Sequence, residues 1–338
     1  MNDWRIYRGA GHPHDEIRRL PAPPPWRDFS AGGADDTLAG SDRRLGVKRR
    51  LVQNHHPRPA ETDAVNAALY LRRPLLVTGN PGTGKSTLAH AVAHELRLGR
   101  VLRWPIVSRS TLQDGLYRYD AIGRLQDVQL ERAQAGASDS AAAAPAGIGS
   151  YIRLGPLGTA LLPSEQPRVL LIDELDKSDL DLPNDLLNAL EEGEFAIPEL
   201  ERLADREPVV EVLSDDGRKV PVYGGRIRCT TFPFIVLTSN GERDFPAALL
   251  RRCIRLELEP PGEEQLGAMI EAHLGPDAVA GDGEQGLVQR FLNREPGEVI
   301  ATDQLLNALY LTQHASRAER VTRERIAEML MQPLDQPR

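Results

Sequence analysis

Residues 79 to 86 read Gly79-Asn80-Pro81-Gly82-Thr83-Gly84-Lys85-Ser86, and this stretch decides the fold. The apolar run Leu75 to Val77 lies just before it, and a helical pattern from Lys85 to about Leu96 overlaps its end. A buried strand, a glycine loop and a helix in this order form the GxxxxGK[ST] arrangement, in which backbone N–H groups surround a phosphate at a helix N-terminus. The stretch therefore predicts an α/β domain that binds a nucleoside triphosphate.

The residues of this loop have separate predicted tasks. Gly82 and Gly84 let the backbone turn its N–H groups inward without a Cβ clash. Lys85 is long enough to reach the β- and γ-phosphates, the Ser86 hydroxyl suits Mg²⁺, and Thr87 lies where the α-phosphate is expected. The predicted nucleotide-binding residues are Gly79, Asn80, Pro81, Gly82, Thr83, Gly84, Lys85, Ser86, Thr87 and Asp173.

Two other interpretations of the glycine loop are weaker. A purely structural glycine turn is the first, and the apolar strand before the loop and the helix after it disfavour it. A dinucleotide site is the second. It fails because Gly82-Thr83-Gly84 is followed by Lys85, Ser86 and Thr87, and the third glycine of GxGxxG is missing.

A second apolar run, Val169 to Ile172, ends in the adjacent carboxylates Asp173 and Glu174. Open α/β sheets bind their ligands at the carboxyl ends of the strands. We expect Asp173 to hold the Mg²⁺ shell together with Ser86, and Glu174 to polarise the attacking water as the general base. The structural alternative is a solvated acidic turn, which the phosphate loop upstream disfavours.

Two later segments carry further candidate catalytic residues. Asn240 follows the apolar run Phe234 to Leu237, and its amide is predicted to hold the lytic water or contact the γ-phosphate. A short predicted helix from Phe245 ends in Arg251 and Arg252, whose permanent charge can stabilise a transferring phosphoryl group. An ordinary turn residue and a surface arginine pair are the structural alternatives.

Apolar strands alternate with helical segments, which predicts a parallel sheet sandwiched by helices. After Pro261 the apolar residues recur at helical spacing, which predicts that a small all-helical lid domain follows; these residues are Leu266, Met269, Ile270, then Leu287, Val288, Phe291, then Leu305, Leu306 and Leu309. The predicted domains are a Pro/Gly-rich N-terminal arm or linker over 1–58, the nucleotide-binding domain over 59–259 and the lid over 260–338. The middle domain carries a mobile Ala/Gly/Ser insertion at about 133–150 and a long insertion at about 195–233. The predicted strands cover 75–77, 101–106, 169–172 and 234–237.

Composition limits the remaining choices. The 338 residues include 41 Lys and Arg against 49 Asp and Glu, a net charge of −8, so nucleic acid is not an expected partner. Cys229 and Cys253 show no CxxC spacing, which fits a reducing compartment. No long apolar run or leader-like segment occurs in the sequence, and we expect a cytoplasmic protein without membrane insertion.

Four segments, in this order and spacing, resemble the AAA+ ATPase superfamily: GNPGTGKS at 79–86, LLIDELDK at 170–177, LTSN at 237–240 and PAALLRRC at 246–253. Within the superfamily, Gly155-Pro156-Leu157 ahead of the acidic strand looks like the MoxR-type branch. An insertion after the second strand and a long segment before Asn240 add to that likeness. The resemblance covers about residues 55 to 330.

This resemblance implies a hexameric ring with ATP and Mg²⁺ held between the α/β domain and the lid. It also implies an arginine finger from the neighbouring subunit, for which Arg252 matches best and Arg251 is second. MoxR-type proteins commonly act beside partners that carry von Willebrand factor A domains. One departure concerns the lid, where such proteins usually offer an arginine after Ser-Pro. This chain reads Thr302-Asp303-Gln304-Leu305, which leaves open whether Gln304 replaces that arginine.

Two functions follow as expectations. The first is a chaperone-type ATPase that hydrolyses ATP to remodel a partner protein. The second is a nucleotide-controlled switch or scaffold that assembles a bacterial conflict or signalling complex and hydrolyses slowly, which the missing lid arginine favours. A nucleic-acid motor lacks a basic cluster with interleaved aromatics, and a GTPase lacks an NKxD base-recognition motif.

Overall fold

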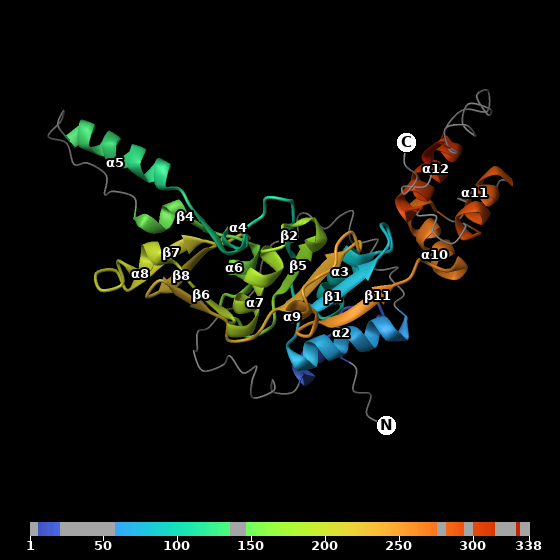
Figure 1. Cartoon of the computed structure of the whole chain (residues 1–338), viewed down its shortest axis with the longest axis horizontal. Helices are drawn as coiled ribbons and strands as arrows, with labels where there is room; N and C mark the ends of the chain where they lie inside the picture. Colours follow the sequence, from blue (N-terminus) through green and yellow to red (C-terminus); the bar gives the residue numbers. More distant parts are fainter. Residues whose placement is uncertain are drawn as a thin grey trace.

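The computed structural model describes residues 6–20, 58–135, 147–275, 282–293, 300–314 and 329–331. Figure 1 shows the main sheet in the middle of an elongated molecule. Helix α5 (Ala121–Ala135) projects at one end, and the C-terminal helices lie at the other.

The main sheet is parallel and carries the predicted nucleotide edge. Within the described residues its strand order is β11-β1-β10-β5-β2, with every neighbouring pair parallel. The predicted parallel sheet is confirmed, and each predicted strand lies in it. The bounds are β1 (Leu75–Gly79), β2 (Leu102–Pro105), β5 (Val169–Asp173), β10 (Phe234–Ser239) and β11 (Ile254–Leu258).

Strand β11 is an edge strand that the sequence analysis did not predict. Exposed Arg255 and Glu257 alternate with buried Leu256 and Leu258, so it lacks the continuous apolar run of the inner strands. It nevertheless pairs along the whole length of β1. Sheet pairing, which a single segment does not encode, makes it a strand.

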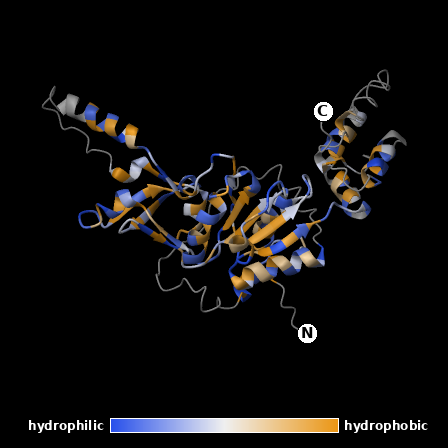
Figure 2. Cartoon of the chain, viewed as in Figure 1, coloured by the Kyte–Doolittle hydropathy of each residue, from blue (hydrophilic) through white to orange (hydrophobic). Residues whose placement is uncertain are grey.

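Helices cover both faces of this sheet. Helices α2 (Pro59–Leu71) and α3 (Lys85–Glu95) pack on one face, and α6 (Pro156–Ala160) and α7 (Leu182–Glu192) pack on the other. Successive residues such as Leu75 and Leu76 point to opposite faces and are both buried. Burial on both faces explains why the inner strands read as unbroken apolar runs, which Figure 2 shows as hydrophobic arrows between the helices.

A second sheet lies beside the first, with the order β3-β4-β7-β8-β9-β6 among the described residues. The predicted long insertion at 195–233 supplies most of it, together with α8 (Pro198–Glu201). Buried Val212, Val222 and Ile227 join the core on the α6 and α7 side of the main sheet, so this insertion is packed into the domain. The strands are β3 (Tyr117–Tyr119), β4 (Ile152–Leu154), β6 (Glu194–Ala196), β7 (Val209–Leu213), β8 (Lys219–Tyr223) and β9 (Arg226–Arg228).

The predicted insertion at 133–150 begins inside α5 and ends in the 3-10 helix η3 (Ile148–Tyr151). Ile148 is buried, and a Cβ placed on Gly149 would lie 1.9 Å from the Glu211 carbonyl oxygen, so the last residues of the segment pack against β7. Residues 136–146 lie outside the described residues. Helix α5, which was not predicted, exposes Ile122, Leu125 and Leu130. Figure 2 shows hydrophobic and hydrophilic stretches alternating along this helix.

The C-terminal helices α10 (Glu263–Leu274), α11 (Asp282–Leu292) and α12 (Thr302–His314) surround a core of their own. Its buried members include Leu266, Ile270, Leu287, Phe291, Leu305 and Leu309, the positions whose helical spacing predicted these helices. The helical character expected after residue 260 is therefore present in the described part. Residues 276–281, 294–299, 315–328 and 332–338 lie outside it.

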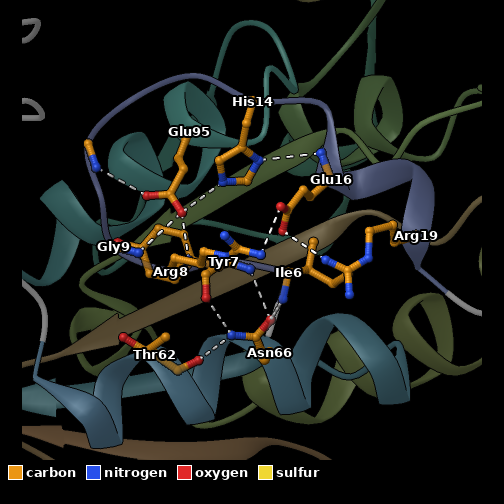
Figure 3. A network of polar contacts seen from close by, with 11 residues as sticks. Ile6, Tyr7, Arg8, Gly9, His14, Glu16, Arg19, Thr62, Asn66 and Glu95 are labelled. Atoms are coloured by element: carbon orange, nitrogen blue, oxygen red, sulfur yellow. Dashed lines mark hydrogen bonds and ion pairs between the residues drawn. The ribbon is translucent and has the colours of Figure 1, made fainter. Parts of the chain in front are cut away.

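Residues 6–20 of the predicted N-terminal arm form a strap across α2 and α3 that ends with the 3-10 helix η1 (Glu16–Arg19) (Figure 3). Ile6 and Tyr7 are fully buried in the α2 and α3 layer. The remainder of the arm, 1–5 and 21–57, lies outside the described residues.

Two buried side chains hold the backbone of this strap. The Asn66 carbonyl oxygen accepts the N–H groups of Ile6 at 2.7 Å and Tyr7 at 3.0 Å, and its amide donates to the Tyr7 carbonyl at 2.8 Å. The Glu95 carboxylate accepts the N–H groups of Arg8 at 2.6 Å and Gly9 at 3.1 Å. These backbone groups of residues 6 to 9 are thereby satisfied by side chains of the two helices, as Figure 3 shows.

Candidate nucleotide site

The phosphate loop joins β1 to α3 at the carboxyl edge of the main sheet. Lys85 is buried, and its Nζ donates to the carbonyl oxygens of Gly79 at 2.7 Å and Asn80 at 2.8 Å. The Thr83 hydroxyl also donates to the Asn80 carbonyl, at 2.9 Å. The lysine thus neutralises the carbonyl side of its own loop, while the outer loop residues Asn80 and Gly82 are exposed.

Two glycines of the loop lie where an added Cβ would collide with the backbone of another segment. Gly79 has φ 145°, and an added Cβ would lie 2.4 Å from the Leu258 carbonyl oxygen. Gly82 has φ 79°, and its Cβ would lie 2.6 Å from the backbone nitrogen of Thr302. The second contact also places the N-terminus of α12 against the phosphate loop, so the loop lies between the α/β domain and the C-terminal helices.

Asp173 is the best-connected carboxylate of the site. Its Oδ1 accepts hydrogen bonds from the Ser86 hydroxyl at 2.7 Å and the Thr238 hydroxyl at 2.8 Å. Its Oδ2 accepts from Arg103 Nη2 at 2.6 Å and Nε at 3.1 Å. Burial opposes ionisation of Asp173, but the hydrogen bonds from these three side chains outweigh it and hold its pKa below the usual value.

Glu174 lies at the strand end in an uncommon backbone conformation, with φ 62° and ψ 50°. A non-glycine residue in this left-handed region is strained, and such strain concentrates at functional sites. The Thr238 hydroxyl accepts the Glu174 N–H at 2.8 Å and so holds this geometry. The Glu174 side chain forms an ion pair with Lys177 at 2.8 Å. It is also partly exposed, so its carboxylate is accessible from solvent.

Asp176 organises the loop that carries Asn240. It lies in the 3-10 helix η4 (Leu175–Lys177) and is almost fully buried. Its Oδ2 accepts the N–H groups of Asn240 at 2.8 Å and Glu242 at 3.1 Å, whereas Oδ1 has no hydrogen-bond partner among the described residues. Because β10 lies between β1 and β5, this contact fixes Asn240 at the same sheet edge as Lys85 and Glu174.

Electrostatics at this edge are dominated by carboxylates around one buried lysine. Burial lowers the pKa of Lys85, and the charges of Asp176, Asp173 and Glu174 oppose that shift. The three carboxylates favour the charged lysine, which is the form that attracts phosphate.

The structure brings most of the predicted site residues together, but Arg251 and Arg252 lie elsewhere. They follow α9 (Ala247–Leu250) and precede β11, whose Ile254 pairs with Leu75 at the amino end of β1. Arg251 is exposed, and Arg252 forms an ion pair with Glu191 of α7. Neither arginine reaches the phosphate loop of its own chain, because that loop begins at the opposite end of β1.

The Gln304 side chain forms hydrogen bonds within the C-terminal helices. Its Oε1 accepts the Ala301 N–H at 2.8 Å, which caps α12, and its Nε2 donates to the Leu330 carbonyl at 3.0 Å. This side chain therefore stabilises the helical unit.

Sequence reasoning missed three residues of this site. Thr238 and Asp176 were each inside a motif that was quoted for its neighbours, and Arg103 lies on β2 without any motif. Their positions could have identified Thr238 and Asp176, because Thr238 follows the same predicted strand as Asn240 and Asp176 follows the same strand as Glu174. No local pattern identifies Arg103, which reaches Asp173 only because β2 pairs with β5.

The donor set fits Mg²⁺ shared with a nucleotide. The Ser86 hydroxyl and the Asp173 carboxylate are hard oxygen ligands 2.7 Å apart, and Mg²⁺ bound through phosphates needs one or two such groups. No cluster of three His, Cys, Asp or Glu side chains suited to a metal occurs in the described part of the chain. The residues therefore fit a metal that arrives with phosphates better than one held by protein alone.

This phosphate loop after β1, together with the carboxylates at the end of β5 in the same parallel sheet, defines a nucleotide-binding protein of the P-loop AAA+ fold. The chain belongs to the AAA domain family, dynein-related subfamily, whose model matches residues 74–253. A comparison with curated protein sequences finds no match.

Among solved structures, the chain is similar to NtrX from Brucella abortus in complex with ADP, at 14% identity and a TM-score of 0.40. The match covers 85% of this chain and 52% of that chain, so this chain spans about half the length of that structure. A likeness this distant carries no residue or function across. Finally, none of the helices in the described ranges is long and apolar enough to cross a membrane.

Proposed function

We propose that this chain is an ATP-hydrolysing remodeller of a partner protein, of the MoxR type, that works as a ring. The observation that carries the ATPase part is the meeting of Ser86 and Asp173 at 2.7 Å, with Lys85 and Glu174 beside them at one sheet edge. Phosphoryl transfer needs positioning and charge stabilisation more than covalent chemistry, and these residue types supply both.

Each group has a proposed role in the reaction. Lys85 would leave the carbonyls of Gly79 and Asn80 to bind the β- and γ-phosphates. Ser86 and Asp173 would hold Mg²⁺, which would neutralise phosphate charge. Glu174 accepts the proton of the attacking water, and its exposed carboxylate supports that role. Asn240 orients the water or contacts the γ-phosphate, held by Asp176 through its backbone N–H.

Two substitutions separate binding from turnover. Lys85→Ala is expected to abolish ATP binding, because it removes ground-state charge from the phosphates. Glu174→Gln is expected to bind ATP with near-normal affinity and to lose hydrolysis, because its carboxylate acts on the water in the transition state. Calorimetry with ATP and a phosphate-release assay measure the two. Equal ATP affinity for wild type and Lys85→Ala would refute the loop assignment.

The ring part of the proposal is supported by the position of the arginines. Arg251 and Arg252 do not reach the site of their own chain, so either of them would act as an arginine finger only on the site of a neighbour, with Arg252 the first choice and Arg251 the second. Release of Arg252 from Glu191 would accompany assembly.

A mixing experiment tests the shared site, because neither Arg252→Ala nor Glu174→Gln alone should hydrolyse ATP. A mixture should recover activity, because some interfaces then combine an intact Glu174 with an intact Arg252. Mixed subunits that co-assemble without any recovery would contradict a shared site with Arg252, and the same mixing with Arg251→Ala tests the second choice.

We also propose the division into an N-terminal arm over 1–58, a nucleotide domain over 59–259 and a lid over 260–338, a cytoplasmic location, a hexamer, and a partner with a von Willebrand factor A domain. The hexamer and the partner rest on the family resemblance, and the location rests on the absence of a long apolar run and of CxxC spacing in the sequence. The separate core of α10, α11 and α12 supports the lid boundary.

A second candidate is a slow nucleotide switch, and one observation favours it. Gln304 caps α12 and binds Leu330, so it offers no charge to a γ-phosphate, and lid movement would be coupled weakly to hydrolysis. Turnover measured with and without captured partner separates the candidates. Strong stimulation supports the remodeller, whereas slow turnover with a stable ATP-dependent complex supports the switch.

A further inference from the structure

Arg103 places a permanent positive charge on the carboxylate proposed to hold magnesium. Its guanidinium lies on the edge strand β2 and donates twice to Asp173 Oδ2, at 2.6 and 3.1 Å. The Ser86 and Thr238 hydroxyls occupy Oδ1, so both oxygens of Asp173 have partners. The Asp173 side chain is 8% exposed and the Arg103 side chain is 52% exposed.

These exposures show that Asp173 is held in place by its surroundings, whereas the Arg103 side chain is free to move into solvent. Asp173 is fixed by three side chains from three elements, and its position does not depend on Arg103 alone. Arg103 is half in solvent and can leave its partner by rotation of its own side chain. An arginine cannot lose its charge by deprotonation, so the pair breaks only by displacement.

A metal ion and the guanidinium would compete for the same carboxylate. Two cations close to one carboxylate repel each other, and this repulsion is strongest where the carboxylate is shielded from water. Lys85 cannot relieve the competition by moving onto Asp173, because in the proposed mechanism it binds the phosphates. Arg103 is therefore the cation that has to yield when Mg²⁺ arrives.

We propose that Arg103 is a displaceable counter-ion of the nucleotide site: it holds Asp173 in the nucleotide-free chain, yields it to Mg²⁺, and thereby raises the Mg²⁺ concentration that the site requires. This inference rests on the proposed binding of a nucleotide together with Mg²⁺. In the opposite role Arg103 would orient Asp173 toward the metal and would lower the Mg²⁺ concentration that the site requires. The two roles predict opposite signs for the same substitution.

Calorimetric titration of ADP, without metal in a chelator and at a series of fixed Mg²⁺ concentrations, measures the requirement directly. For Arg103→Gln, the Mg²⁺ concentration that gives half of the metal-dependent gain in ADP affinity is expected to fall about three- to fivefold, the upper part of the range for a partly exposed ion pair. ADP affinity in the chelator is expected to stay within about twofold of wild type, since Arg103 does not contact the phosphate loop in the proposed mechanism.

Arg226→Gln is the matched control. Arg226 is also a strand arginine with an exposed side chain, paired with Glu201 at 2.9 Å, but it lies on β9, an inner strand of the second sheet. Its Mg²⁺ requirement is expected to equal that of wild type. A second variant, Arg103→Lys, keeps the charge but loses the two-pronged contact, and it is expected to lie between wild type and Arg103→Gln.

An unchanged or higher Mg²⁺ requirement in Arg103→Gln overturns the counter-ion role, and a higher one assigns the orienting role instead. If Arg103→Gln loses its cooperative melting transition, Arg103→Lys decides by the same sign. Failure of the proposed function has a different signature. In that case wild type itself binds no ADP at any Mg²⁺ concentration, and both proposals fall.

Discussion

Asn66→Ala tests whether the N-terminal strap is an integral part of the domain. Asn66 is fully buried in the middle of α2, and it satisfies three backbone groups of the strap, two on Tyr7 and one on Ile6. Its fourth bond, to the Thr62 carbonyl, lies within α2. Truncation to alanine removes all of these contacts without adding bulk.

The expected loss of stability follows from the groups left behind. Each buried backbone group without a partner costs about 1–3 kcal/mol, so three of them would give a loss of about 3–9 kcal/mol. Detachment of the strap limits this loss to the free energy with which Ile6, Tyr7 and Ile17 dock, since all three are buried against the α2 and α3 layer. Alanine is the better helix former, and its propensity offsets less than about 1 kcal/mol.

Denaturant unfolding followed by far-UV circular dichroism measures the change, and hydrogen exchange of residues 6–20 shows whether the strap detaches. Asn188→Ala, an exposed asparagine on α7, is the control and should be neutral or slightly stabilising. ADP binding should persist, because the strap contacts Asn66 and Glu95, away from the phosphate loop. A loss below about 1 kcal/mol, with unchanged exchange, would refute the reasoning that these buried backbone groups depend on Asn66.

Two other predictions concern the backbone and the thiols. The free energy of unfolding of Glu174→Gly should exceed that of Glu174→Ala by about 1 kcal/mol, because glycine accepts φ 62° without strain and alanine does not. Denaturant unfolding measures the difference, and equal stabilities would mean that the strain is absent. Burial raises the pKa of the Cys253 thiol to about 12, and Cys229 is also buried. Neither cysteine should therefore react with a thiol reagent at neutral pH until the chain unfolds. Rapid labelling of the native protein would contradict this burial.

The sequence alone determined the parts of this protein that depend on local pattern. The glycine loop, its lysine and the acidic strand end are encoded within short segments, because a phosphate loop needs a fixed run of backbone conformations and a buried strand needs a run of apolar residues. The C-terminal helices were predicted for the same reason, since the spacing of Leu266, Ile270, Leu305 and Leu309 records the face that each helix buries.

Only the tertiary structure decided how distant segments meet. Strand β11 alternates polar and apolar residues, and its pairing with β1 makes it part of the parallel sheet. Arg103 meets Asp173 because β2 lies beside β5, and Asn66 meets residues 6 and 7 because the strap crosses α2. The two side-chain contacts join residues 60 and 70 positions apart, and the two strands are farther apart still in the sequence. Local periodicity does not predict such contacts, because the chain between the partners is free to fold in many ways until the core forms.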